Sequence, residues 1–179
     1  MALQGSYILA PVNGTLLVRT GRTGAAAKAG HDLVIEVTDW KATLEVGEDP
    51  AQTWLALDAD AASFRVREGK GGMQALGEDD KTSIRRTIDD EVLKGNAIKF
   101  RSTEVATDAD WGRISVRGDL TLVGRSHPVA FDLLIGGDGR LSASAVVRQT
   151  DWGIKPYSTL FGALKVADEV EVTFDAGPL

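Results

Sequence analysis

The chain has 179 residues, of which 43% are hydrophobic and 26% charged, a composition that suits one globular domain with a substantial core. Its formal net charge of −6 disfavours general binding to nucleic acid or to an anionic membrane, because both partners attract a basic surface. The chain contains no cysteine, which excludes disulfides, thiolate catalysis and thiolate metal sites.

The start of the chain carries no recognisable targeting signal. Gln4, Gly5 and Ser6 interrupt its apolar residues, and no basic stretch precedes them. No segment is long and apolar enough for a membrane span. The sequence as it stands therefore predicts a cytoplasmic protein with no integral membrane association, or a periplasmic or secreted one if a leader has been removed.

Strand patterns fill most of the first half of the chain. Residues 7–9 and 15–20 form the first predicted strands, since apolar and polar side chains alternate there between turn residues. The small-residue segment 21–30 is either a loop or a short helix at one end of the fold; its glycine spacing does not match a phosphate-binding loop. The alternation in residues 33–46 predicts a second hairpin or one long bent strand.

The next strands follow at residues 54–60 and 63–67, with Arg65 and Arg67 expected to face water. A loop rich in glycine and lysine then leads to a different pattern. Apolar residues recur every four positions between Ile84 and Val92, which predicts an amphipathic helix of about three to four turns over residues 80–94. Gly95 can end this helix in the left-handed conformation.

The second half of the chain is again strand-like. Its clearest part is a hairpin over residues 118–135, in which residues 124–128 supply the turn, because Gly124 favours a positive φ and Pro128 cannot continue a central ladder. The whole chain contains about eight to ten strand patterns at spacings of roughly 8 to 12 residues, which is typical of a sandwich or a barrel. A barrel is favoured because closure removes exposed strand edges.

A set of residues around the central hairpin resembles a known family. They are Ile98, Phe100, Ser102, Thr103, Gly118, Leu120, Thr121, Gly124, Pro128 and Val129, together with residues 148–154. Their arrangement resembles that of the YceI-like family of lipid- and polyisoprenoid-binding proteins, over nearly the whole chain. The resemblance implies an all-β fold: a single domain over residues 1–179, formed by an extended antiparallel eight-stranded lipocalin-like β-barrel with one amphipathic helix over an opening. It also implies an elongated apolar pocket for an isoprenoid tail.

Few side chains offer catalytic or metal chemistry. His31 lies beside Asp32 and His127 lies in the hairpin turn, but no serine stands in the strand-turn context of a nucleophile. Two distant histidines without cysteine make a poor metal site. We therefore predict no catalytic residue, no metal and no cofactor, and a bonded His31–Asp32 pair that pins a loop or contacts a ligand head group.

Residues 148–166 are too apolar for an ordinary exposed loop, while glycine and proline prevent a long helix. This segment is either a plug that seals one end of the barrel or a lid that borders an apolar pocket, with Arg148 or Lys155 at its mouth. Alanines at predicted inward positions would leave space for a ligand. These are Ala42, Ala56, Ala59, Ala97, Ala143 and Ala145.

The sequence-based prediction is a non-catalytic carrier that holds a polyisoprenoid or other long-chain lipid in the barrel. The residues predicted to bind the ligand are His31, Phe64, Phe100, Phe131, Arg148, Trp152, Ile154, Tyr157, Leu160 and Phe161. Two alternatives remain open: a stress-related or structural barrel with a filled core that acts through its surface or as a homodimer, and a hydrolase or isomerase on the same barrel.

Overall fold

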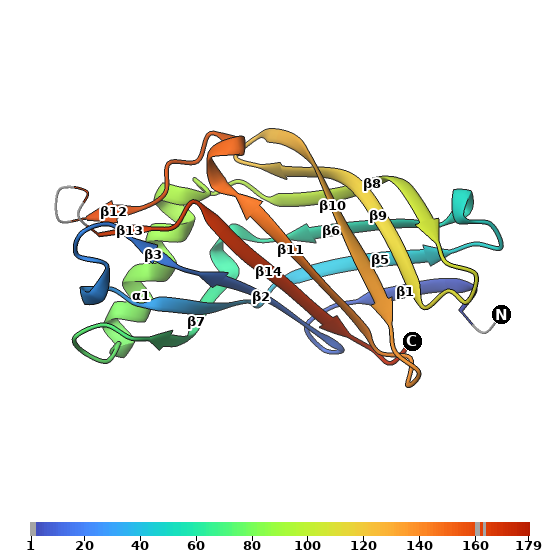
Figure 1. Cartoon of the computed structure of the whole chain (residues 1–179), viewed down its shortest axis with the longest axis horizontal. Helices are drawn as coiled ribbons and strands as arrows, with labels where there is room; N and C mark the ends of the chain where they lie inside the picture. Colours follow the sequence, from blue (N-terminus) through green and yellow to red (C-terminus); the bar gives the residue numbers. More distant parts are fainter. Residues whose placement is uncertain (1–2, 160–161, 163) are drawn as a thin grey trace.

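Eleven strands of the computed structural model form one curled antiparallel sheet, drawn in Figure 1. The structure describes residues 3–159, 162 and 164–179. In sheet order, the strands are β1 (Gly5–Leu9), β5 (Trp40–Val46), β6 (Trp54–Ala59), β8 (Ile98–Thr107), β9 (Arg113–Leu122), β10 (Arg125–Ile135), β11 (Leu141–Arg148), β14 (Glu169–Ala176), β2 (Gly14–Thr20), β4 (Asp32–Val37) and β7 (Phe64–Lys70).

The sheet curls into a barrel because its strands bend. β4 continues into β5, and β6 continues into β7 through the short helix η3 (Ala61–Ser63), so that β4–β7 and β5–β6 are two parts of one bent hairpin. The Thr38 N–H donates to the Ser63 carbonyl at 2.9 Å, and the Asp60 N–H donates to the Asp39 carbonyl at 3.0 Å, which carries the pairing across the bend. The structure therefore contains the bent strand that the alternation of residues 33–46 allowed.

The bends also correct the predicted number of strands. β1 and β2 pair with β5 and β4 respectively, so these two segments run one after the other along the same bent neighbour. Three pairs of consecutive segments thus follow one path each, and the eleven segments make eight passes around the barrel. The all-β barrel is confirmed, whereas the count of eight strands becomes eleven because a bend interrupts the ladder.

The central hairpin is present, but its turn is shorter than predicted. Val123 and Gly124 alone form the turn, with φ angles of 46° and 74°, the positive values that a two-residue hairpin turn requires. Pro128 therefore lies within β10, paired with Asp119 of β9. β11 pairs with β10 only from Leu133 onward, so β10 has no neighbouring strand on that side at Pro128. The absence of an N–H in proline therefore costs no hydrogen bond of the ladder there.

Helix α1 (Glu78–Thr87) lies at one end of the barrel, whereas both chain termini lie at the other end (Figure 1). It continues into a π-helical turn, η4 (Ile88–Val92), and Gly95 follows with a φ of 68°. The predicted helix and its left-handed end are thus confirmed. At its start, the Gly77 N–H donates to the Asp80 carboxylate at 2.9 Å.

A small second sheet lies at the same end as α1. It joins β12 (Ser158–Thr159), β13 (Leu164–Val166) and β3 (Arg22–Thr23). The small-residue segment before β4 contains a short helix at this end, η1 (Ala27–Ala29), one of the two structures expected from its sequence. Two distant parts of the chain, β3 on one side and β12 and β13 on the other, therefore meet beside the helix.

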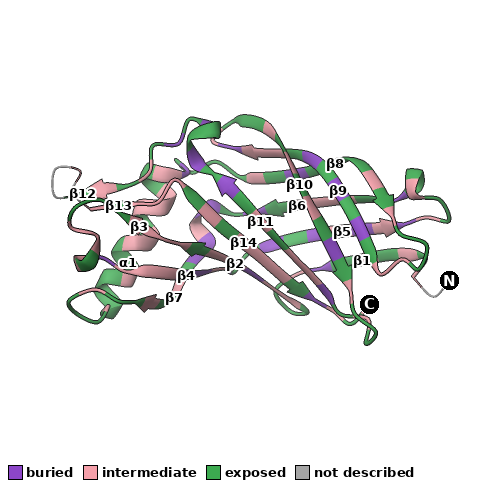
Figure 2. Ribbon diagram, in the orientation of Figure 1, coloured by how far each residue is buried: buried purple, intermediate pink, exposed green. Residues whose placement is uncertain are grey.

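The two ends of the barrel differ in how their interior is filled. Near the termini, Leu44, Ile114 and Leu141 are at most 1% exposed. Near the helix, the inward side chains are mostly half-buried, and α1 has no buried residue. Figure 2 shows this difference as buried residues along β5 and β9 and half-buried or exposed residues on α1. A hollow interior at the helix end explains these intermediate exposures.

Candidate functional site

A cavity of about 580 Å³ occupies the helix end of the barrel interior. Its wall is formed mostly by apolar side chains that alternate inward along the strands, as Leu16 and Val18 do on β2. Phe100, Leu120 and Phe131 form the wall on the neighbouring strands β8, β9 and β10. The size and the apolar lining are those of a small-molecule site that buries most of its ligand.

Small side chains help to create this space. Of the alanines predicted to face inward, Ala42, Ala59, Ala143 and Ala145 line the cavity. The predictions for Ala56 and Ala97 were wrong. Leu55, Leu57 and Ala59 take the inward positions of β6, so alternation turns Ala56 outward, and Ala97 is exposed because β8 begins only at Ile98. A position one residue from an inward side chain in a strand faces the opposite side.

Helix α1 forms the remaining side of the cavity. Ile84 of α1 presents an apolar side chain to the interior, as do Leu76 before the helix and Ile88 after it, and a polar stripe of Asp80, Ser83 and Thr87 runs beside them. Spacings of three and four residues place these side chains on one face of the helix. The polar stripe was not predicted from the sequence, although its residues stand at helical spacing beside Ile84 and Ile88.

Five of the residues predicted to bind a ligand lie on the cavity wall: Phe64, Phe100, Phe131, Ile154 and Tyr157. The rings of Phe100 and Phe131 pack against each other with their centroids 5.5 Å apart and their planes tilted by 53°. Ile154 and Tyr157 come from the apolar segment after β11, at the same end as α1. The predictions for Leu160 and Phe161 lie outside the described residues.

Trp152 lies in the barrel wall and does not line the cavity. It is buried among Leu122, Val147 and Ile154, and its indole Nε1 donates to the Leu120 carbonyl at 2.7 Å. Its ring also meets His127 edge-on, with the centroids 5.4 Å apart. The segment after β11 thus behaves as a plug at Trp152 and as a pocket margin at Ile154 and Tyr157, because short turns aim neighbouring side chains in different directions.

Arg148 also lies away from the cavity. Val147 faces inward on β11, so Arg148 faces outward, where it donates to the Glu169 carboxylate at 3.1 Å. This hydrogen bond raises the pKa of Arg148 above its ordinary value. Close by, hydrogen bonds from the Thr150 hydroxyl and N–H lower the pKa of Asp168. Both groups lie on the outer surface.

His31 and Asp32 do not bond to each other, contrary to the predicted pair. The His31 Nε2 atom lies 2.6 Å from the Gln74 carbonyl oxygen, in the loop that leads to α1. Asp32 instead pairs with Arg22 at 3.3 Å. Consecutive residues at a strand start point to opposite sides, which separates the two side chains. His31 is absent from the cavity lining, but it connects two loops at the helix end.

Metal-binding and membrane-spanning features are not found in the part of the chain that the structure describes. Those residues contain no group of three or more His, Asp or Glu side chains that could hold a metal ion. Within the same residues, no helix combines the length and the apolar character needed to cross a membrane. Among the described residues that line the cavity, Asp80 is the only charged one.

Comparisons with known proteins complete the description of the site. Residues 18–177 match the family model described as the YceI-like domain. The crystal structure of BcnA from Burkholderia cenocepacia superposes with a TM-score of 0.67 at 14% sequence identity, covering 93% of this chain and 97% of that one. The YCEI protein of Campylobacter jejuni superposes with a TM-score of 0.52 at 15% identity, covering 79% and 81%. No curated protein is a significant match in sequence.

Proposed function

Because the chain belongs to the YceI-like family, whose model matches residues 18–177, we propose that it is a non-catalytic carrier for a polyisoprenoid or another long-chain lipid. Family membership supports a binding role in general. The apolar cavity at the helix end of the barrel is the observation that carries the more specific proposal. The lipid chain would occupy this cavity, between the packed end of the barrel and α1.

The volume of the cavity limits the size of the ligand. At the packing density of a protein interior, about 0.75, the cavity holds a chain on the order of 20 carbon atoms. Each buried methylene contributes about 0.8 kcal/mol, so such a chain supplies ample affinity even after the entropic cost of binding. The Phe64, Phe100 and Phe131 rings would contact the chain, and Ile154 and Tyr157 would contact it near the helix end.

Helix α1 supports a ligand in this position. An amphipathic helix is stable when its apolar face is buried, yet none of the residues of α1 is buried. Ile84 and the following Ile88 face the cavity and stay half-buried. An apolar guest would complete the burial of this face and hold the helix against the barrel.

The charges of the site favour binding without chemistry. A general acid or base near neutral pH needs a shifted pKa inside the pocket. Among the described residues, the groups whose pKa is clearly shifted are Arg148 and Asp168, and both lie on the outer surface. The alternative of a filled barrel disagrees with the cavity, whereas action as a homodimer gains no support from the described residues.

Extraction of bound lipid tests the proposal. The protein is purified without detergent and analysed by native mass spectrometry and, after solvent extraction, by lipid mass spectrometry. We expect a long-chain lipid to copurify with it. In Ala145→Phe, the new ring would fill the cavity, and the lipid should be lost. Ala56→Phe is the matched control, because Ala56 faces outward from β6, and it should keep the lipid.

Two results would contradict the carrier proposal. One is a protein that copurifies with no lipid and is not stabilised by any added long-chain alcohol or acid. The other is equal lipid binding by Ala145→Phe and the unaltered protein, which would place the ligand elsewhere.

A further inference from the structure

A buried amide side chain is part of the mostly apolar wall of the cavity. Gln149 starts the short helix η5 (Gln149–Trp152) at the end of β11, and it lines the cavity although it is only 8% exposed. Its backbone N–H donates to the Asp168 carbonyl at 2.9 Å, and its own carbonyl accepts from the Ile154 N–H at 3.2 Å. Hydrogen bonds of its backbone N–H and carbonyl therefore fix the position of Gln149.

The side-chain amide of Gln149 has a defined orientation. Its Nε2 atom lies 3.0 Å from the Ala167 carbonyl oxygen. Because a carbonyl oxygen only accepts hydrogen bonds, the nitrogen must face it and Oε1 must be the other end of the amide. Among the described residues, no donor is bonded to Oε1. An oxygen that lacks a partner inside a mostly apolar cavity is costly, and a bound molecule can supply the missing donor.

The Oε1 atom is also accessible to such a molecule. Among the described residues, the one fully enclosed side-chain nitrogen or oxygen without a partner is Trp40 Nε1. Gln149 Oε1 is therefore not sealed in the packed wall, and Gln149 is one of the residues that line the cavity. Gln149 thus offers an acceptor to a cavity whose lining is mostly apolar and also includes Ile154 and Tyr157.

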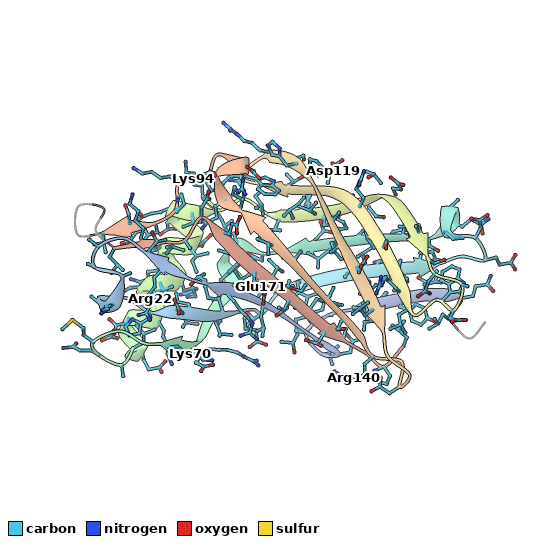
Figure 3. The ribbon with its side chains drawn as sticks, in the orientation of Figure 1. Arg22, Lys70, Lys94, Asp119, Arg140 and Glu171 are labelled. Carbon is cyan, nitrogen blue, oxygen red and sulfur yellow. The ribbon has the colours of Figure 1, made fainter. Side chains whose placement is uncertain are left out.

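Other polar groups on the helix side also line the cavity. The Asp80 carboxylate only accepts hydrogen bonds, and Ser83 and Thr87 offer hydroxyls from the same face of α1. No Lys, Arg or His is among the described residues that line the cavity. Two cations at this end are paired with carboxylates: Arg22 pairs with Asp32, and Lys70 pairs with Glu68 at 3.5 Å. Figure 3 shows Arg22 and Lys70 at the helix end.

We infer that the cavity selects a long-chain ligand whose polar end is an uncharged hydrogen-bond donor, a free hydroxyl, which donates to Gln149 Oε1. This inference rests on the proposed carrier function and adds the chemistry of the head group. A chain that ends in a phosphate or a carboxylate is rejected, because its anionic oxygens accept hydrogen bonds and Gln149 Oε1 is itself an acceptor. Specificity thus comes from the donor that a hydroxyl offers to Oε1 and from the repulsion between Oε1 and an anionic oxygen.

The test compares three probes with the same 20-carbon isoprenoid tail: geranylgeraniol, its methyl ether and its monophosphate. Their dissociation constants are measured by equilibrium titration below the concentration at which they form micelles. We expect the alcohol to bind about 5- to 10-fold more tightly than the ether, because the ether cannot donate. The monophosphate should bind on the order of 100-fold more weakly than the alcohol.

A variant assigns this preference to Gln149. Gln149→Met keeps the length of the side chain and removes the acceptor, so the alcohol and the ether should bind equally. Gln4→Met is the matched control at an exposed position near the start of the chain, and it should leave the ratio unchanged. Because Gln149→Met also loses the bond to Ala167, its fold is checked by circular dichroism; if it does not fold, the comparison of probes on the unaltered protein decides.

The outcomes separate this inference from the carrier proposal. Equal binding of the alcohol and the ether, or tighter binding of the monophosphate, overturns the head-group inference and leaves the carrier function standing. If none of the three probes binds, both proposals fail. A preserved alcohol preference in folded Gln149→Met overturns the role of Gln149.

Discussion

The two ends of the barrel are built from the same strands but serve different purposes. At the terminal end, the inward side chains of β5, β9 and β11 meet one another, and Leu44, Ile114 and Leu141 are almost completely buried. At the helix end, the inward positions of the same barrel surround a cavity of about 580 Å³. Stability is therefore concentrated at one end, and the capacity to bind a guest is concentrated at the other.

The largest expected difference between the ends concerns leucine truncation. Leu44→Ala at the packed end should lower the free energy of unfolding by about 3 to 5 kcal/mol, because it leaves a new void among close neighbours. Leu57→Ala on the cavity wall should cost only about 1 to 2 kcal/mol, since that side chain already lacks neighbours on one side. Denaturant unfolding of the lipid-free proteins measures both values, and equal losses would refute the contrast.

Enlarging an alanine should have opposite effects at the two ends. Ala176→Leu should destabilise the protein by about 1 to 3 kcal/mol, since Ala176 is 0% exposed and lies against β2 and β11. Ala145→Leu should be neutral or stabilise the lipid-free protein by up to about 1 kcal/mol, because the added carbons enter the cavity. The melting temperatures of the two variants check this prediction. A destabilised Ala145→Leu would indicate that the wall there is already filled.

The closed end of the cavity should limit the length of the bound tail. For a series of alcohols, affinity should rise by about fourfold for each added methylene while the chain still fits. The rise should stop at a length on the order of 20 carbon atoms, when the packed end blocks further entry. Titration of the series measures the break. A rise that continues far past this length would mean that the terminal end opens.

The smallest expected effect concerns the outer surface. The pKa of Asp168 is lowered from 3.8, chiefly by the hydrogen bond from the Thr150 hydroxyl. A lowered folded-state pKa adds stability above pH 3.8, and this contribution is lost as the pH falls through the folded value. Thr150→Val should return the pKa of Asp168 towards its ordinary value, as measured by NMR titration, without changing lipid binding. Weaker binding in this variant would connect the surface cluster with the cavity.

Local patterns predicted much of the fold. Alternating side chains located the strands, and the four-residue spacing from Ile84 to Val92 located the helix, because both periods follow from backbone geometry. The turn of the central hairpin was assigned too many residues. Gly124 belongs to it, but Pro128 is a strand residue. Proline is tolerated there because β10 has no neighbouring strand on one side at that position. Which side of a strand lacks a neighbour depends on the sheet and cannot be read locally.

The candidate site was predicted less completely, and the misses have a common cause. Phe64, Phe100 and Phe131 were identified from their inward positions in strands, and they line the cavity. Arg148 and Trp152 were selected as parts of an apolar segment, but the turns after β11 aim them away from the interior. Gln149, between a strand and a turn, carries no signal in the sequence that distinguishes it from an exposed glutamine.

The sequence by itself determined the strands, the single amphipathic helix and the apolar inner surface, since each depends on neighbours a few residues away. The tertiary structure alone decided that one end of the barrel is packed and the other is hollow. That outcome depends on the summed volume of side chains from every strand around the barrel, and on bends that set the distances between the walls. Periodicity tells which side chains face inward, whereas only the assembled barrel tells whether they fill the space they enclose.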